Sequence, residues 1–296
     1  LIVSCGGAPC APCSVAYGSA PAPSDAIPIE WLSIPRGGRL PLVAAYGQGL
    51  RARLVLDTGS NMHLWGRGAL WVLSAHSTDG QDERGVDALD PEERAVPMER
   101  FDPLPLSVGL RGLPDRIEAL GRPLGVLEEL GLAGLLSPQH LARRLPPSQG
   151  GLRIDLVRSR VSVISAAELE RALREGTPLE AMCRSPEGTP LFGVSVQAEG
   201  RTRRVIVDTG SDAVVLHDPG GTWARARSRE TDWFWALGGA SERPVIETDL
   251  RFAGVSRRVR LSLIPTAHCA EGQLGIDALE GCSLSVGRDR AALECR

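Results

Sequence analysis

The sequence predicts a mainly β protein with two similar lobes, and three observations lead to this prediction. The chain has 296 residues, a length that typically forms about two domains. Short apolar stretches joined by turns are typical of β-hairpins. One such hairpin occurs twice, far apart in the chain, and each copy ends in the same four residues.

The composition excludes several classes of protein. Hydrophobic residues make up 43% of the chain and charged residues 23%, which is typical of a globular protein. The formal net charge of −3 gives no basic surplus for nucleic acid. No apolar run approaches the roughly 20 residues that cross a bilayer. All 33 basic residues are arginine, which excludes lysine-based Schiff-base and P-loop chemistry.

The N-terminal residues have the pattern of an exported protein. Residues 2–5 read Ile-Val-Ser-Cys, the order of a bacterial lipobox in which Cys5 would carry the lipid anchor. The alternative is a remnant of a signal peptide whose cysteine falls there by chance. Residues 1–28 are expected to form a tether, because the part after Cys5 is rich in Ala, Pro, Ser and Gly. We therefore expect a periplasmic or membrane-anchored lipoprotein, or an extracellular protein.

The cysteines favour an oxidising compartment. Four of them lie in the second half of the chain without metal-ligand spacing, so local disulfides are expected there. Four cysteines allow three pairings, and the sequence does not choose among them. The Cys10 to Cys13 spacing lies in the tether, where a small disulfide or free thiols are favoured over a redox motif. The four are Cys183, Cys269, Cys282 and Cys295.

The repeated hairpin is the main structural signal. Residues 41–46 lead through a turn to residues 54–60, and residues 190–196 lead through a similar turn to residues 205–211. In each copy the second strand is apolar and continues directly into Asp-Thr-Gly-Ser. A matching pair of hairpins predicts two units built on one scaffold.

The similarity continues after each hairpin and sets the domain boundaries. Residues 133–141 are followed by strand-like segments, and residues 271–279 are followed by a similar one. The predicted division is a lobe at residues 29–165, a linker at residues 166–185 and a lobe at residues 186–296. The linker begins with a helical stretch near residues 166–174.

These motifs resemble the pepsin and retropepsin superfamily of aspartic proteases, over most of residues 37–165 and 187–296. The resemblance implies a mainly β, two-lobed acid protease fold with an internal duplication. In that superfamily each lobe supplies an Asp-Thr-Gly loop, and a later apolar-apolar-Gly segment braces it. A single Asp-Thr-Gly is usually a turn, but two copies after apolar strands are specific.

Two carboxyl groups explain the expected chemistry. Peptide hydrolysis without a metal or covalent nucleophile needs one carboxylate to take a proton from water and one carboxylic acid to bind the carbonyl oxygen. Two aspartates within a few Å satisfy both needs, because the pair retains a single proton. Asp57 and Asp208 are the predicted catalytic pair.

The residues after each aspartate have expected supporting roles. The resemblance implies that Thr58 and Thr209 join the two loops by hydrogen bonds from their hydroxyl groups to the backbone. The glycines allow backbone N–H groups to approach the carboxylates closely. The serines are expected to donate to the outer carboxylate oxygens. The glycines and serines are Gly59, Gly210, Ser60 and Ser211.

Several positions depart from the family pattern. Ser137 stands where the first bracing segment usually has glycine, and Gln273 replaces an apolar residue in the second. Both tyrosines precede Asp57, so the usual tyrosine of a pepsin flap is missing. Trp233 and Trp235 are flap candidates before a Gly-Gly turn, with a role in the lobe core as the alternative. Residues 79–94 are expected to form a solvated acidic loop.

The sequence thus predicts an aspartic endopeptidase acting on extended polypeptides. Both loops lie in one chain, so a monomer is expected to be active. No zinc-hydrolase or phosphate-loop motif occurs, and no metal or cofactor is expected. A structural role is favoured for His63, with a position in the cleft as the alternative. The competing functions are an exported peptide-binding pseudoprotease and a structural surface lipoprotein.

Overall fold

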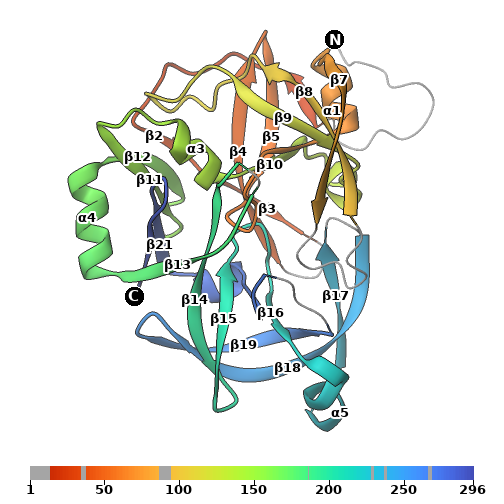
Figure 1. The fold of residues 1–296 in the computed structure, drawn as a ribbon, viewed down its shortest axis with the longest axis vertical. Helices are drawn as coiled ribbons and strands as arrows, with labels where there is room; N and C mark the ends of the chain where they lie inside the picture. The colour runs from red at the N-terminus through yellow and green to blue at the C-terminus, as the bar shows by residue number, and fades with distance from the viewer. Residues whose placement is uncertain are drawn as a thin grey trace.

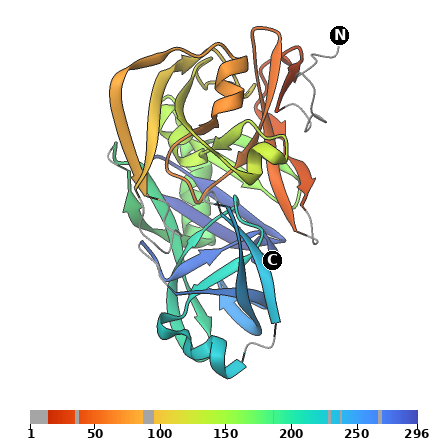
Figure 2. The same cartoon turned by 90° about the vertical axis from the view of Figure 1, so that its right-hand side faces the viewer.

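The computed structural model describes residues 14–34, 38–86, 95–185, 187–227, 230–236, 239–265 and 269–296. With 53% of residues in strands and 15% in helices, the mainly β class is confirmed. The strands form two sheets. The first lies in the upper part of the molecule, and the second extends from the lower part to β11, β12 and β2 on the left-hand side (Figure 1); Figure 2 shows the same arrangement from the side. Among the described residues, no helix is both long and apolar enough to span a membrane.

The first sheet is built from strands of the N-terminal half of the chain. Its order is β3-β4-β5-β10-β6-β9-β8-β7, and β1 pairs with β5. The end of β5 lies in the core, since the side chains of its last three residues, Leu54 to Leu56, are buried. Its strands are β1 (Val15–Tyr17), β3 (Glu30–Ser33), β4 (Arg39–Gly47), β5 (Leu50–Leu56), β6 (Leu64–Gly66), β7 (Ser77–Val86), β8 (Ala95–Leu104), β9 (Ile117–Arg122) and β10 (Gly134–Leu136).

The second sheet combines strands from both ends of the chain. Its order is β17-β18-β19-β16-β20-β15-β14-β13-β22-β21-β11-β12-β2. Its strands are β2 (Ala26–Pro28), β11 (Gln149–Asp155), β12 (Arg160–Ser165), β13 (Thr177–Arg184), β14 (Pro190–Ala198), β15 (Arg201–Val207), β16 (Val214–His217), β17 (Glu230–Ala236), β18 (Gly239–Phe252), β19 (Val255–Ile264), β20 (Gly272–Leu274), β21 (Cys282–Val286) and β22 (Ala291–Cys295).

The same order of strand pairings occurs in both sheets. In the first sheet β10 lies parallel to β5 and antiparallel to β6, β6 is parallel to β9, and β9 continues through β8 to β7. In the second sheet β20 lies parallel to β15 and antiparallel to β16, β16 is parallel to β19, and β19 continues through β18 to β17. Each Asp-Thr-Gly loop therefore follows an equivalent strand, β5 or β15.

The two parts of the chain also meet within one sheet. Strand β11 pairs antiparallel with β21, with Leu152 opposite Val286 and Ile154 opposite Leu284. Strand β12 flanks β11 on one side, and β22 flanks β21 on the other. This pairing joins a segment near the middle of the chain to its C-terminal strands.

The helices are short and lie at the ends of strands. Helix α4 begins with a capping box, since the Ser165 hydroxyl accepts from the Glu168 N–H and the Glu168 carboxylate accepts from the Ser165 N–H. The helices are α1 (Arg67–Val72), α2 (Val126–Glu129), α3 (Pro138–Arg144), α4 (Ala166–Glu175), α5 (Thr222–Arg227), α6 (Ile276–Leu279) and the 3-10 turn η1 (Pro219–Gly221).

Three expectations about the chain's organisation are corrected. Residues 14–28 are not all tether, because β1 pairs with β5 and β2 pairs with β12. The linker contains the expected helix α4, but its second part is strand β13, which pairs with both β14 and β22. Residues 79–86 are not a loop; they lie in β7, which pairs with β8. This strand could not be predicted from hydrophobic alternation, because β7 is at the edge of the sheet and an edge strand can be polar on both faces.

The cysteines of the second half form two disulfides. Cys183 of β13 is bonded to Cys269, and Cys282 is bonded to Cys295 directly across β21 and β22. The Cys183–Cys269 bond ties β13 to the segment that leads into β20. Cys5, Cys10 and Cys13 lie outside the described residues, as does the expected tether before residue 14.

Candidate active site

The two Asp-Thr-Gly loops, residues 57–60 (first loop) and 208–211 (second loop), are held by equivalent backbone hydrogen bonds. The Asp57 N–H donates to the Leu136 carbonyl of β10 at 3.0 Å. The Asp208 N–H donates to the Leu274 carbonyl of β20, also at 3.0 Å. Each aspartate is thus set at the end of its own strand by a bond to the bracing strand beside it.

The two threonines join the loops to each other. The Thr58 hydroxyl donates to the Val207 carbonyl at 2.7 Å and accepts from the Thr209 N–H at 2.9 Å. The Thr209 hydroxyl donates to the Leu56 carbonyl at 2.6 Å and accepts from the Thr58 N–H at 3.1 Å. Thr58 is 1% exposed and Thr209 is fully buried, so water does not compete for these bonds. The bonds expected of both threonines are present.

The carboxyl groups meet because each lies against the glycine of the opposite loop. A Cβ added at Gly59 would lie 2.3 Å from the Cγ of Asp208, and one added at Gly210 would lie 2.4 Å from the Cγ of Asp57. The Gly59 N–H donates to Asp57 Oδ1 at 2.7 Å, and the Gly210 N–H donates to Asp208 Oδ1 at 2.8 Å. Only glycine permits this close approach at both positions.

The electrostatics of the pair favour a shared proton. Burial raises the pKa of Asp57 well above its usual value, the negative charge of Asp208 raises it further, and a hydrogen bond between the two carboxyl groups acts in the same direction. The backbone N–H groups of Gly59 and Ser60 oppose this rise in pKa. Asp57 is 7% exposed and Asp208 8%, so both residues are buried. Two carboxyl groups this close together can share a single proton.

The serine hydroxyls do not act as expected. The Ser60 hydroxyl donates to the Met62 carbonyl at 2.7 Å, and the Ser211 hydroxyl donates to the Ala213 carbonyl at 3.1 Å. Each closes a turn within its own loop, which is a common role for a serine beside a tight turn. At Asp57 the contribution of Ser60 comes from its backbone N–H instead.

The brace of the first loop uses side chains, and of these only Gln139 was not singled out from the sequence. Ser137 is fully buried at the start of α3, where its hydroxyl accepts from the His140 N–H at 3.2 Å. Its own N–H donates to Nδ1 of His63 at 3.1 Å. The amide of Gln139 donates to the Thr58 carbonyl at 2.5 Å. Serine in place of glycine therefore adds hydrogen bonds to this brace.

His63 belongs to a buried pair of histidines behind the first loop. The rings of His63 and His140 are 4.7 Å apart and nearly perpendicular. Burial lowers the pKa of His63 well below its usual value, and the neighbouring His140 and Arg144 lower it further. His63 is 3% exposed, which agrees with the structural role favoured for it.

The brace of the second loop uses backbone groups. The Ile276 N–H donates to the Ser211 carbonyl at 2.8 Å, and the Asp277 N–H donates to the Asp212 carbonyl at 3.0 Å. A Cβ at Gly275 would lie 2.1 Å from the Ala213 carbonyl oxygen, so this position requires glycine. Gln273, the other departure from the family pattern, is 5% exposed within β20.

The flap candidates lie in a hairpin. Trp233 and Trp235 are in β17, where their backbones pair with Glu242 and Ala240 of β18. Their side chains and the turn at residues 237–238 lie outside the described structure. The flap assignment stays a prediction.

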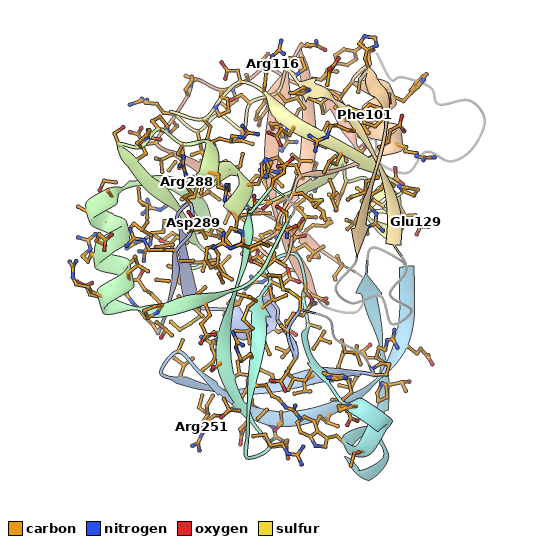
Figure 3. The ribbon with its side chains drawn as sticks, viewed as in Figure 1. Phe101, Arg116, Glu129, Arg251, Arg288 and Asp289 are labelled. Carbon is orange, nitrogen blue, oxygen red and sulfur yellow. A yellow bond between two sulfur atoms is a disulfide. The ribbon has the colours of Figure 1, made fainter. Side chains whose placement is uncertain are left out.

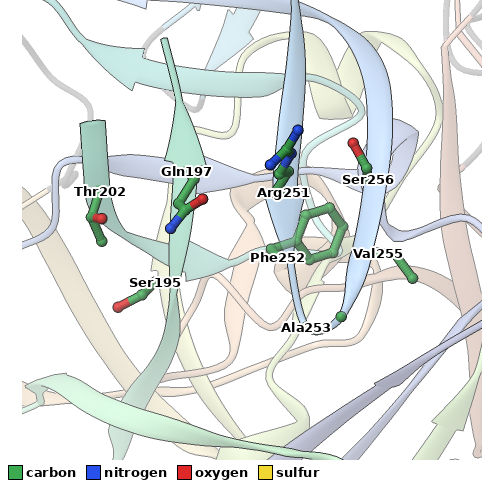
Figure 4. A pocket seen from close by; sticks show the side chains of 9 residues that line it. Ser195, Gln197, Thr202, Arg251, Phe252, Ala253, Val255 and Ser256 are labelled. Carbon is green, nitrogen blue, oxygen red and sulfur yellow. The ribbon is translucent and has the colours of Figure 1, made fainter. Parts of the chain in front are cut away.

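Two other features can be separated from this site. A pocket of about 430 Å³ lies where Gln197, Thr202 and Arg251 approach one another (Figure 4). The pocket is at the lower end of the molecule, where Arg251 is labelled (Figure 3). Thr202, which lines it, precedes Asp208 by six residues, or about 20 Å along an extended strand. The polar residues that line the pocket are exposed.

A cluster of possible metal ligands lies beside the histidine pair. One ligand atom each from Glu118, His140 and Glu187 falls within 4.8 Å of the others. Glu118 contacts Arg144 and His140, and Glu187 pairs with Arg100 at 3.0 Å. A metal ion would have to displace two guanidinium groups, so the cluster is better described as an ion-pair network.

Comparison with known proteins adds no family assignment. No family model matches the chain, and no curated protein sequence matches it.

Proposed function

We propose that this protein is an aspartic endopeptidase with two related lobes, similar in plan to the pepsin and retropepsin superfamily. The observation that carries the proposal is the meeting of two Asp-Thr-Gly loops, with each carboxyl group against the glycine of the other loop. The recurring order of strand pairings around β5 and β15 supports an internal duplication. Both loops belong to one chain, so a monomer would hold the complete site.

The proposed reaction uses a water molecule between the two carboxyl groups. The ionised carboxylate takes a proton from this water as its oxygen forms a bond to the peptide carbonyl carbon. The protonated carboxyl group donates its proton to the carbonyl oxygen, which gives a tetrahedral diol. The carboxyl pair then gives the proton that it took from water to the amide nitrogen. The carbon–nitrogen bond breaks as a hydroxyl of the diol returns a proton to the pair, which again holds one proton.

The surroundings of Asp57 and Asp208 suit each step. Burial and mutual repulsion keep one proton on the pair, as the raised pKa of Asp57 indicates. The N–H groups of Gly59 and Gly210 stabilise the ionised form. The threonine bonds hold both loops in place without using the carboxyl oxygens.

The proposed location is outside the cytoplasm. Two disulfides in the second half of the chain are typical of an oxidising compartment. A lipid anchor at Cys5 is part of this proposal. It is tested by mass spectrometry of the protein from a bacterial membrane fraction, with Cys5→Ser as the control.

The catalytic assignment is tested by comparing the wild type with Asp57→Asn and Asp208→Asn. We expect each variant to lose at least about 10³-fold in the rate of cleavage of an unfolded protein between pH 3 and 7. Thermal unfolding should show no loss of stability, because each change replaces a buried carboxyl group by an uncharged group of the same size. Asp249→Asn, an exposed carboxylate paired with Arg258, is the matched control and should retain full activity.

The outcomes separate the candidate functions. Cleavage that survives both substitutions would reject the site. A wild type that is inert at every pH but binds unfolded peptides would identify a pseudoprotease. A wild type that neither cleaves nor binds them would favour a structural role.

A further inference from the structure

The carbonyl of Thr58 accepts a hydrogen bond from a buried side chain that comes from another part of the chain. The donor is Nε2 of Gln139 in α3, at 2.5 Å, and Gln139 is 1% exposed. This carbonyl belongs to the same peptide group as the Gly59 N–H. That N–H donates to Oδ1 of Asp57 at 2.7 Å. A single peptide group thus connects the Gln139 amide with the carboxyl group of Asp57.

The Gln139 amide is itself held in one orientation. The Ser137 hydroxyl donates to Gln139 Oε1 at 3.4 Å, while the same hydroxyl accepts from the His140 N–H. The Ser137 backbone is anchored by its bond to His63 Nδ1. With Oε1 facing a hydroxyl donor, the NH₂ group must face the Thr58 carbonyl. The bond to the loop therefore has a defined direction.

We propose that Gln139 is a positioning residue for Asp57, acting through the peptide group between Thr58 and Gly59. This inference rests on the proposed function. A donor on the carbonyl side of a peptide polarises it and strengthens the bond that its N–H makes, an effect that is larger in a site shielded from water. Gln139 thus orients the Gly59 N–H and strengthens its bond to the ionised carboxylate.

Among the residues that the structure describes, no glutamine occupies the equivalent position beside the second loop. Gln139 lies two residues after Ser137, and the residue two after Gly275 is Asp277. An ionised carboxylate has no proton to donate, and Asp277 is exposed rather than buried. The polarising bond thus acts on Asp57 and not on Asp208. This difference makes the effect of Gln139 separable from effects common to both loops.

The test replaces Gln139 by methionine, which has a similar length and no amide. Carbon-13 NMR of carboxyl-labelled aspartate follows the titration of the Asp57 and Asp208 pair. Asp57→Asn and Asp208→Asn identify the signals. Without the polarised N–H the ionised form is less stable, so we expect the lower apparent pKa of the pair to rise by about 0.5 unit. We also expect kcat to fall about tenfold, KM to change less than about threefold, and the acid limb of the kcat profile to shift with the NMR pKa.

Two further variants keep the test decisive. Gln197→Met makes the same change at an exposed position of β14 and should alter neither the titration nor kcat. Ser137→Ala leaves Gln139 in place but removes the hydroxyl that orients it, so a smaller shift in the same direction is expected. If Gln139→Met does not fold, the same measurements on Ser137→Ala test the inference in its place.

The results distinguish the inference from the proposed function. An unchanged titration and unchanged kcat, with only a lower melting temperature, would overturn the positioning role. A wild type without proteolysis would reject the proposed function. In that case the NMR titration still decides whether Gln139 acts on Asp57.

Discussion

The two Asp-Thr-Gly loops occupy equivalent places but are braced by different chemistry. The first loop is held by side chains, through Gln139, Ser137 and His63. The second loop is held by the backbone N–H groups of Ile276 and Asp277. The position of each aspartate therefore depends on having a brace of the right geometry, and the chain reaches that geometry in two ways.

The residue before the next strand pairing differs between the two loops and goes with the choice of brace. The loops have the same length, since Leu64 and Val215 each lie seven residues after their aspartate and make equivalent pairings with the bracing strand. In the first loop the residue before this pairing is His63, whose ring accepts from the Ser137 N–H. In the second loop it is a valine, which has no side-chain acceptor. There the Ala213 carbonyl lies directly against Gly275 and excludes a side chain.

A second difference is covalent. The Cys183–Cys269 disulfide holds the segment that leads into the second brace, while no cysteine lies between Cys13 and Cys183 to do the same for the first. The disulfide closes a sequence separation of 86 residues, against 13 for Cys282–Cys295.

The largest expected effect comes from removing that disulfide. Replacing Cys183 and Cys269 together by alanine should lower the free energy of unfolding by about 5 kcal/mol, because a longer loop is released in the unfolded chain. The same replacement of Cys282 and Cys295 should cost about 3 kcal/mol. Urea unfolding of both double variants measures the difference. Equal losses would show that loop length does not govern these contributions.

An exchange of residues between the two braces should have a smaller and unequal effect. Gly275→Ser should cost about 3 kcal/mol, because its Cβ would lie 2.1 Å from a backbone oxygen that cannot move freely. Ser137→Gly keeps a residue that is tolerated at a helix N-cap and should cost only about 0.3 kcal/mol. Chemical denaturation of the two variants provides the comparison. A mild Gly275→Ser variant would contradict the explanation that the Ala213 carbonyl excludes a side chain there.

The smallest expected effect is a pH dependence that comes from His63 of the first brace. His63 stays neutral in the folded protein because its pKa is lowered, whereas in the unfolded chain it takes up a proton below about pH 6.5. The stability that neutral His63 contributes is therefore present above that pH and is lost as the pH falls toward the folded pKa.

His63→Asn isolates this contribution, since its side-chain oxygen can accept the Ser137 N–H but does not titrate. Between pH 6.5 and 5.5 the variant should lose about 1 kcal/mol less stability than the wild type. His76→Asn, at an exposed position, is the control and should follow the wild type. Parallel curves for the wild type and His63→Asn would show that His63 does not set this dependence.

The raised pKa of Asp57 acts in the opposite direction. The folded protein holds a proton there that the unfolded chain releases at a lower pH. Its contribution to stability is present at low pH and is lost as the pH rises through the folded pKa. Subtracting the pH dependence of the free energy of unfolding of Asp57→Asn from that of the wild type separates this trend from that of His63.

The sequence indicated the parts of the candidate site whose signal is local. Asp57 and Asp208 each follow an apolar strand within a short motif, and the threonine and glycine beside them have roles tied to that motif. Gln139 could not be found in this way. It contacts Thr58 across 81 residues, and nothing in its immediate neighbours marks it as different from any other buried glutamine.

The same limit applies to the fold. The apolar strands β5 and β15 were predicted, but the polar strand β7 was expected to be a loop, because its pairing with β8 is not visible in its composition. The small strands β1 and β2 were assigned to a tether for the same reason. One clue to the different braces is in the sequence, since six residues after its aspartate the first copy has His63 and the second has Val214.

The amino-acid sequence by itself determined the mainly β class, the two Asp-Thr-Gly loops and the presence of four cysteines in the second half. Only the tertiary structure decided which cysteines pair, which side chains brace each loop and that the two carboxyl groups share one site. Periodicity and turn chemistry act over a few neighbouring residues, and they can be read in order along the chain. Hydrogen bonds, burial and disulfides depend on which distant segments come together, and that is set by the packing of the whole molecule.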